Sequence, residues 1–388
     1  MRASSTTVYN RRLGASGYWD KGTKGYGHDI FAKEKAEALQ QVLPQVAIRM
    51  NTCMEAGGQW GPGRFRSLLH MALWGNQGDS SLFTVAEMGA KGGADMQNSR
   101  LLVDDTDLIF NHLDLTLDAA VSEVHMFNDN SGMEIVSDLA LVHYLLNSGK
   151  VAKVVMHLKP YPFFVSDAVP ADIDHTLSVL AASLDATQQK VAADLRGFLE
   201  SGRLALTNSG PINNFLASPE PMWCMSPQVR SHLSDPKVIH STHMYIYIYT
   251  YVYMYTCIHV CICVYIYIRK VALVICKGDL MYRKLLGDRT WNTVEKFPDI
   301  LSYFPSPVVA LRTCKSPLAV GMIPGQEKTV ADVSPNWMVN GEYGMVQFSS
   351  TPPKASVSVT ADGYRVDYDA ALLEQQWQSL VGVYGFKK

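Results

Sequence analysis

Short apolar runs rich in β-branched residues alternate with helical stretches from about residue 100 onward, and this alternation limits the possible folds more than any other feature. The runs are bounded by turn residues and lie at 101–105, 121–130, 151–160, 271–279 and 307–315. Two segments between them, 135–147 and 173–201, have helical periodicity. Buried strands separated by helices predict an α/β fold with a mostly parallel, doubly wound sheet.

The first 100 residues have a different pattern, which predicts helices. Residues 29–50 place apolar side chains near helical spacing, and Asp29 is the expected N-cap. Shorter helices are expected at 66–74 and 81–88, separated by a Gly/Asn break. We therefore expect a helical N-terminal domain over 1–100.

Composition excludes several classes of protein. The 388 residues carry 34 basic and 36 acidic side chains, a formal net charge of −2, which excludes the broad basic surface of a nucleic-acid binder. The cysteines, 7 in all, are odd in number and mostly scattered among apolar residues, as in proteins of a reducing compartment. The first residues lack the apolar core of a secretory signal. We expect a cytoplasmic or nuclear protein without a membrane partner.

A tyrosine-rich segment at 245–268 departs from the rest of the chain. It has no formal charge and alternates Tyr with Ile, Val, Met or Cys. Its length would suit a membrane helix, but Tyr prefers the membrane interface. Cys257, Cys261 and Cys263 have no second Cys/His cluster to complete a zinc site. Because a TA dinucleotide repeat encodes alternating Tyr and Ile, we interpret 235–269 as a translated intron or microsatellite, a low-complexity insert prone to aggregation.

Oxygen-bearing side chains follow two of the predicted strands, at the sheet edge where α/β proteins bind ligands. Asp129 and Asn130 come directly after one apolar run, and their hard oxygens suit Mg²⁺ or Mn²⁺. Asp167 lies in the loop after the next strand and could fold back to add a third oxygen. The alternative is that Asp129 caps the following helix and Asp167 is a solvated loop residue.

A possible anion site follows the run 271–279. Gly278 turns the chain into a helix that begins at Asp279, so free backbone N–H groups and a positive dipole end would face the sheet edge. Arg283 and Lys284 lie in its first turns, and Lys315 ends another strand. This geometry suits phosphate, although no Walker loop is present. A capped amphipathic helix whose basic residues face water explains the same pattern.

Two other patterns do not point to function. Asp105 and Asp107 match the D-x-D motif of aspartyl-phosphate hydrolases, but Ile109 replaces its usual Thr or Val, so we interpret them as structural carboxylates. The glycine-rich residues 89–95 follow no buried strand and therefore lack the fingerprint of SAM-dependent methyltransferases.

An ordered set of motifs resembles the damage-control metal-dependent phosphatases. The matching subgroup acts on sugar phosphates and is also named after a proposed acidic-residue methyltransferase activity. The resemblance extends over 8–348 except for the tyrosine-rich segment. The motifs include LWGNQGDSSL (73–82), FNDNSGMEIVSDL (127–139), HLKPYPFFVSDA (157–168), KGDLMYRKLLGD (277–288), FPSPVVALRTCK (304–315) and NWMVNGEYGMVQF (336–348).

The resemblance implies a helical N-terminal domain packed on an α/β/α catalytic domain, with a divalent metal at their interface. Mn²⁺ is expected ahead of Mg²⁺, Co²⁺ or Ni²⁺. The implied metal ligands, which also count as catalytic residues, are Asp129, Asn130 and Asp167. The implied substrate-binding residues are Asp279, Leu280, Met281, Tyr282, Arg283, Lys315 and Asn76.

The expected domains are a helical N-terminal domain at 1–100 and a catalytic domain at 101–234 and 270–388, interrupted by the insert at 235–269. Of the family's N-terminal helix pattern only the tail matches, at 9–13, so the resemblance implies a helical domain truncated at its start.

The activity implied by the resemblance is metal-dependent hydrolysis of small sugar phosphates such as fructose 1-phosphate, so the expected partner is a small phosphorylated metabolite. Two alternatives stay open at this point. One is SAM-dependent methylation of protein glutamate side chains, and the other is an inactive, mis-spliced product.

Deletion of residues 235–269 should raise the soluble yield, because an uncharged strand that alternates aromatic and β-branched residues favours pairing between molecules. The deletion rejoins a helix to a strand through the short link that α/β units use. Size-exclusion profiles and Mn²⁺-dependent phosphate release of the two proteins test this. A deletion variant that does not fold, beside an active full chain, would show that the segment is an evolved element.

Overall fold

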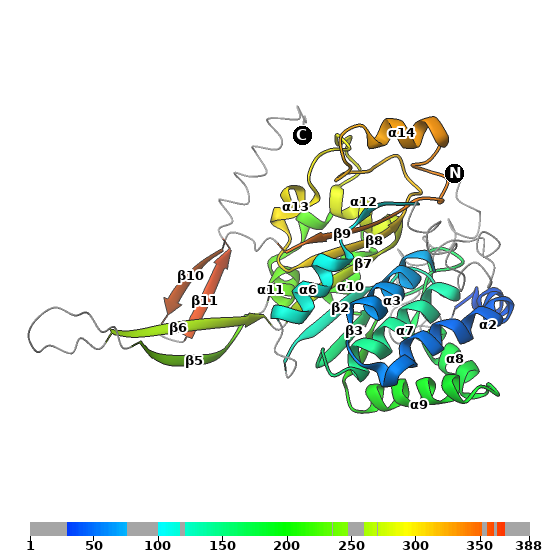
Figure 1. Ribbon diagram of the computed structural model, residues 1–388, viewed down its shortest axis with the longest axis horizontal. Helices are drawn as coiled ribbons and strands as arrows, with labels where there is room; N and C mark the ends of the chain where they lie inside the picture. Colours follow the sequence, from blue (N-terminus) through cyan, green and yellow to red (C-terminus); the bar gives the residue numbers. More distant parts are fainter. Residues whose placement is uncertain are drawn as a thin grey trace, which may run out of the picture.

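The sheet at the centre of the molecule has seven strands. The structure is a computed structural model that describes residues 29–75, 100–116, 121–234, 236–246, 260–269, 271–350, 355–360 and 363–368. The strand order is β1-β9-β8-β7-β2-β3-β4 (Figure 1). The strands are β1 (Leu101–Asp104), β2 (Glu123–Phe127), β3 (Lys153–His157), β4 (Leu204–Thr207), β7 (Val271–Lys277), β8 (Val308–Thr313) and β9 (Gly344–Ser349).

The sheet is mostly parallel, as predicted. Neighbouring strands from β8 through β7, β2 and β3 to β4 pair in parallel, whereas β9 pairs antiparallel with β8 and parallel with β1. From β2 the chain proceeds outward to β3 and β4 and later returns to β7 on the other side of β2. The strand order therefore reverses between β2 and β7. In open α/β sheets, ligands bind at the carboxyl ends of the strands that flank such a reversal.

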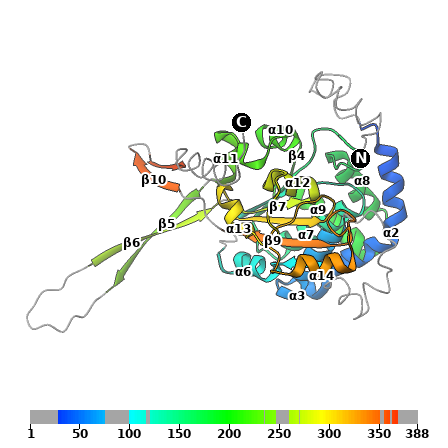
Figure 2. The same ribbon diagram turned by 90° about the horizontal axis from the view of Figure 1, so that it is seen from above.

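Helices cover both faces of the sheet. One face carries α2 (Ala32–Met54), α3 (Pro62–Trp74), α6 (Thr106–Thr116), α7 (Met133–Asn147), α8 (Pro170–Ala181) and α9 (Ala186–Glu200). The other carries α10 (Pro211–Ala217), α11 (Pro227–Ser234), α12 (Gly278–Leu286) and α13 (Phe297–Ile300). Figure 2 shows α12 on one side of the sheet and α3 with α6 on the other. The remaining helical segments are α14 (Gln326–Val333), η1 (Glu55–Gly58), η3 (Met222–Cys224) and η4 (Leu301–Tyr303).

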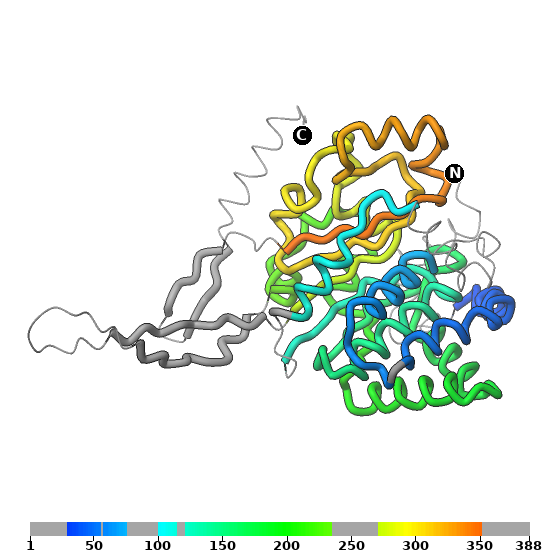
Figure 3. The backbone as a smooth tube through the Cα atoms, viewed as in Figure 1, coloured from blue at the N-terminus to red at the C-terminus, as the bar shows by residue number. Residues whose placement is uncertain are grey.

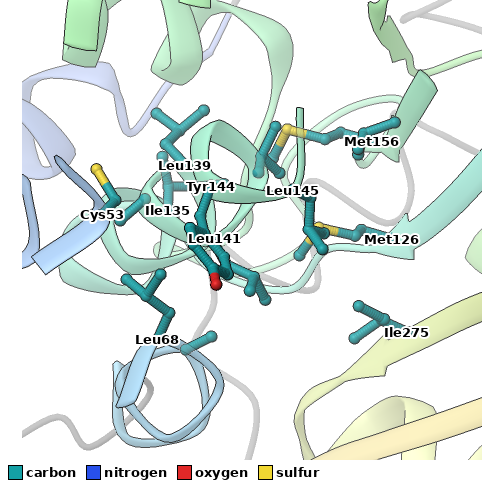
Figure 4. Packing of buried hydrophobic residues seen from close by; sticks show 14 of the residues in the cluster. Cys53, Leu68, Met126, Ile135, Leu139, Leu141, Tyr144, Leu145, Met156 and Ile275 are labelled. Carbon is teal, nitrogen blue, oxygen red and sulfur yellow. The ribbon is translucent and has the colours of Figure 1, made fainter. Parts of the chain in front are cut away.

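Apolar side chains that point alternately to the two faces of the central strands form a core on each side of the sheet. Leu273 and Ile275 of β7 pack among the helices of one face, while Val274 and Cys276 pack on the other. Side chains two apart share one face of a strand, so a run of apolar residues serves both layers. Helix α7 is buried from Glu134 to Leu146, because it lies between the sheet and the N-terminal helices (Figures 3 and 4). The helical N-terminal region is thus part of the layer over α7.

Several details differ from the sequence-based expectations. The helical stretch 173–201 forms two helices, because the Asp185 carboxylate caps α9 by accepting the N–H groups of Thr187 and Gln188 at 2.7 and 3.3 Å. Helix α2 begins at Ala32 rather than at Asp29, whose carboxylate accepts the Phe31 N–H at 2.8 Å. Strands β4 and β9 were not predicted; only Leu204 of β4 is buried, so this edge strand has a weak apolar signal.

The tyrosine-rich segment contributes to a separate sheet. Strand β5 (Pro236–Ile246) pairs antiparallel with β6 (Val260–Arg269), and β10 (Ala355–Thr360) pairs antiparallel with β11 (Gly363–Tyr368). Neither pair joins the seven-stranded sheet.

The interpretation of 235–269 as translated non-coding sequence stays a prediction, as do the domain boundaries. The predicted helix at 81–88 lies outside the described residues. Among the helices of the described ranges, none combines the length and apolar character needed to cross a bilayer.

Two histidines are buried side by side on β2 and β3. The Nδ1 atom of His125 lies 2.9 Å from Nε2 of His157, and the two rings stack. Burial lowers the pKa of both imidazoles, for His157 to about 3. Protonation therefore favours the unfolded chain, where a histidine has a pKa of about 6.5. The neutral His157 therefore contributes its full stabilisation above about pH 6.5, and this stabilisation is lost as the pH falls from about 6.5 towards 3.

We expect the unfolding free energy of the wild type to fall by about 2 kcal/mol more than that of His157→Gln between pH 7 and pH 5. The reason is that only the wild type must keep His157 neutral in the folded state. Urea unfolding at both pH values measures the difference, and His175→Gln, at an exposed histidine, is the matched control. Equal pH slopes for the wild type and His157→Gln would contradict the prediction.

Candidate active site

The three oxygen-bearing residues singled out in the sequence lie together in the structure. The loop after β3 folds back so that Asn130 and Asp167 form an isolated antiparallel bridge. The Ser131 N–H donates to the Ser166 carbonyl at 2.7 Å, and the Ala168 N–H donates to the Asp129 carbonyl at 3.0 Å. These backbone contacts place Asp129, Asn130 and Asp167 at the carboxyl edge of β2 and β3.

The side-chain amide of Asn130 has a fixed orientation. Its Nδ2 donates to Oε2 of Glu134 at 3.0 Å and to Oδ2 of Asp129 at 3.1 Å. Its Oδ1 accepts the Ser166 hydroxyl at 2.7 Å. Two carboxylates take the N–H₂ end and a hydroxyl takes the oxygen, so the amide of Asn130 is fixed at both ends.

Asp167 and the buried Lys159 complete this cluster. Oδ2 of Asp167 accepts the N–H groups of Phe163 and Phe164 at 2.8 and 2.9 Å. Nζ of Lys159 lies 3.4 Å from Oδ1 of Asp129 and 3.9 Å from Oδ1 of Asp167. Burial raises the pKa of Asp167, as does the charge of Asp129, while Lys159 opposes them. Burial lowers the pKa of Lys159, but the negative charges of Asp167 and Asp129 outweigh it and raise the pKa overall.

A second ion cluster lies directly behind Asn130. Lys277 at the end of β7 is 1% exposed, and its Nζ lies 2.8 Å from Oδ1 of Asp138 and 3.3 Å from Oε1 of Glu134. It also donates to the Ala72 carbonyl at the end of α3. Burial raises the pKa of Glu134 to about 7, with Lys277 opposing the shift and Asp129 adding to it. This cluster holds Glu134 where it orients Asn130.

The turn from β7 into α12 approaches Asp129 closely. Gly278 has φ +84, and a Cβ atom there would lie 2.0 Å from Oδ2 of Asp129. Both the positive φ and the lack of space for a Cβ atom require a glycine at this position. The first N–H groups of α12 have no partner within the helix, so the predicted anion-binding end lies beside Asp129.

Asp279 ties the start of α12 to the loop after β8. Its Oδ1 accepts Arg312 Nε at 2.7 Å, the Ser316 hydroxyl at 3.0 Å and the Lys315 N–H at 3.4 Å. The Arg312 side chain is fully buried. The Asp279 carboxylate is therefore engaged in positioning the loop that carries Lys315.

The other implied substrate residues have varied surroundings. Met281 and Tyr282 are 1% exposed, and the Tyr282 hydroxyl donates to Gln347 Oε1 at 2.8 Å, so only their backbone N–H groups could reach an anion. Leu280 is 39% exposed.

The Arg283 guanidinium is paired with a neighbouring carboxylate: its Nε and Nη2 both bind Asp288 at 2.6 Å. Lys315 has an exposed side chain near Gly341, and Asn76 lies outside the described residues.

The N-terminal helical region reaches the cluster through Lys35, which the sequence analysis did not single out. Its Nζ donates to the Asp167 carbonyl at 2.5 Å and to Asp29 and Asp172 at 2.6 and 2.8 Å. Lys159 was also missed, although a lysine shortly after a buried strand was a usable signal.

Asp105 lies at the opposite edge of the sheet, because β1 runs antiparallel to β2. Its carboxylate accepts the Phe348 N–H at 2.8 Å.

The donor set fits a hard divalent cation. Two carboxylates and one carboxamide lie together at this sheet edge, and oxygen ligands from such groups suit Mg²⁺ or Mn²⁺. Within the described ranges no group of three His, Cys, Asp or Glu side chains forms a metal site, and this set has only two carboxylates because Asn130 supplies the third oxygen. Fold and site together define an α/β protein with an oxygen-rich polar site where the strand order reverses.

Comparison with known proteins identifies the family. The profile of the damage-control phosphatase ARMT1-like domain matches residues 3–242 and 250–330. The chain belongs to this family, as the sequence motifs predicted. It is 30% identical over 292 residues to "Damage-control phosphatase ARMT1" of Mus musculus, covering 73% of this chain but only 58% of that protein. It is 30% identical over 336 residues to the protein of the same name of Rattus norvegicus, covering 82% of this chain and 68% of that protein.

A solved structure also matches the chain. It is a DUF89 family protein from Pyrococcus horikoshii, 13% identical, with a TM-score of 0.40 and coverage of 91% of this chain and 92% of that one.

Gly278→Ala should destabilise the protein more than Gly210→Ala does. Both glycines have positive φ, but nothing lies within 4 Å of a Cβ at Gly210. The control variant should lose about 1 kcal/mol through backbone strain, and Gly278→Ala about 1–3 kcal/mol more, because the methyl group must displace Asp129. Urea unfolding compares the two. Equal losses would show that Asp129 moves freely and is not held against the turn.

Proposed function

We propose that the chain is a metal-dependent phosphatase that hydrolyses small sugar phosphates. The observation that carries the proposal is that Asp129, Asn130 and Asp167 lie together beside the start of α12 at one sheet edge. Hard oxygen ligands and an anion-binding helix end are the two elements that metal-assisted phosphoryl transfer needs. Family membership supports a phosphatase, and the choice of sugar phosphates, such as fructose 1-phosphate, rests on the resemblance of the motifs.

Asp129, Asn130 and Asp167 would hold the divalent cation, for which we propose Mn²⁺. When bound, the cation supplies polarisation of a phosphoryl oxygen and of water. Glu134 fixes the amide of Asn130 through the 3.0 Å bond from Nδ2, so that Asn130 would offer its oxygen rather than its N–H₂ group to a cation. The two backbone N–H groups on Asp167 Oδ2 leave Oδ1 as its ligand atom. Burial excludes competing water and strengthens these contacts.

The first N–H groups of α12 and the Lys315 ammonium would bind the phosphoryl oxygens of the substrate. Neutral N–H donors at a helix start stabilise an anion at no cost in side-chain ordering. Asp279 contributes by holding the Lys315 backbone N–H at 3.4 Å rather than by contacting the phosphate. Arg283 joins the phosphate only if it leaves Asp288, so we assign it to the rim of the site. The alternative of SAM-dependent methylation rests only on the other name of the subgroup. The glycine-rich residues 89–95 lie outside the described part of the chain.

Asp129→Ala should abolish phosphate release from a sugar phosphate at every Mn²⁺ concentration, because it removes an anionic ligand from a hard cation. Asp167→Asn should retain an oxygen ligand and lower activity about 10–100-fold, with partial rescue at high Mn²⁺. EDTA should inactivate the wild type. The measurements are phosphate release and Mn²⁺ binding by calorimetry.

Asp332→Asn, at an exposed position on α14, is the control for loss of a carboxylate and should behave as the wild type. Wild-type turnover in both site variants would show that the metal assignment is wrong. A wild type whose activity resists EDTA would argue against metal dependence itself.

A further inference from the structure

Lys159 is a buried cation whose ammonium group is only weakly bonded. Its side chain is 7% exposed. In the described part of the chain, its contacts with acceptors are the 3.4 Å hydrogen bond to Asp129 Oδ1 and the 3.9 Å ion pair with Asp167 Oδ1. An ammonium has three N–H donors, and buried donors are normally all satisfied. Lys159 therefore keeps donor capacity at the centre of the proposed metal site.

Three other buried lysines near the site are held more tightly by the protein. Lys277 lies 2.8 Å from Asp138, and Lys35 donates at 2.5 Å to the Asp167 carbonyl. Lys284 donates to the carbonyl oxygens of Phe215 and Ser218 at 2.9 and 2.7 Å, at the end of α10. These three lysines have short contacts with acceptors of the protein, whereas both contacts of Lys159 are 3.4 Å or longer.

Formal charge indicates what Lys159 could recognise. Asp129, Asp167 and Lys159 sum to −1, and a divalent cation changes this to +1. A site of charge +1 attracts a phosphate monoester dianion, whereas the same site without Lys159 would be neutral. Conversely, Lys159 repels the metal, since like charges in a buried site destabilise each other.

We propose that Lys159 is a substrate-binding residue of the phosphatase site, which donates its unused N–H groups to a phosphoryl oxygen and lowers the affinity for the metal in return. This inference rests on the proposed function. Lys159 would contact a phosphoryl oxygen from the β3 side of the site, and the first N–H groups of α12 would contact the phosphate from the β7 side. The two effects have opposite signs, which separates this role from a structural one.

Lys159→Met tests the proposal, because methionine keeps the length of the side chain and removes its charge. We expect Mn²⁺ to bind on the order of tenfold more tightly, and inorganic phosphate to bind the Mn²⁺-loaded protein on the order of a hundredfold more weakly. Calorimetry measures both affinities, and the kcat/KM for a sugar phosphate should fall with the phosphate affinity. Lys159→Arg, which keeps the charge, should restore much of the phosphate affinity.

Lys190→Met is the matched control, since Lys190 is 58% exposed and pairs with Asp194 on α9. It should leave both affinities unchanged. If Lys159→Met does not fold, Lys159→Gln removes the charge while keeping a hydrogen bond to Asp129 within reach. Wild-type phosphate affinity in the neutral variant, or weaker binding of both ligands, would overturn the role of Lys159 while the metal site stands. A wild type that binds no divalent cation would overturn the proposed function as well.

Discussion

The buried Lys277 cluster is the interaction on which the rest of the site depends. Lys277 ends β7, its carboxylate partners Glu134 and Asp138 belong to α7, and its carbonyl partner Ala72 lies in the last turn of α3. One ammonium group thus joins the sheet, the helix that follows Asn130, and the N-terminal helical region. Removing one partner of a buried ion pair costs about 3–5 kcal/mol, because the others stay buried without compensation. A loss of Lys277 would therefore disturb all three elements at once.

From this cluster a chain of contacts leads outward to the three proposed metal ligands. Glu134, fixed by Lys277, accepts the amide N–H of Asn130 and so directs its oxygen. Lys35 on α2 holds the backbone of Asp167, and the approach of Gly278 limits where Asp129 can lie. Each ligand is thus positioned by a different element, which makes the site a product of the whole packing arrangement. Preorganisation of this kind reduces the cost of binding a metal and a phosphate together.

Family membership and the charge balance of the site complement each other. The ARMT1-like domain match covers most of the chain, and the family's name indicates phosphatase chemistry. The structure adds a distribution of charge, in which two carboxylates face one weakly bonded lysine at the edge of β2 and β3. The three charges sum to −1, so the site attracts a divalent cation first and an anion once that cation is bound, as expected of the proposed metal-dependent phosphatase.

The sequence by itself determined the parallel strands and the turns into helices after Asp129 and Gly278, because these depend on local periodicity and turn chemistry. It also singled out the oxygen-bearing residues that we propose as metal ligands. It did not reveal Lys159, Lys35 or Lys277 as site residues, nor the pairing of Arg283 with Asp288. Lys35 contacts a residue 132 positions away and Lys277 one 205 positions away. A lysine has the same local signature whether it faces water or a buried carboxylate. Only the tertiary structure decides between these two surroundings of a lysine, because packing of distant segments brings the carboxylate close and excludes water.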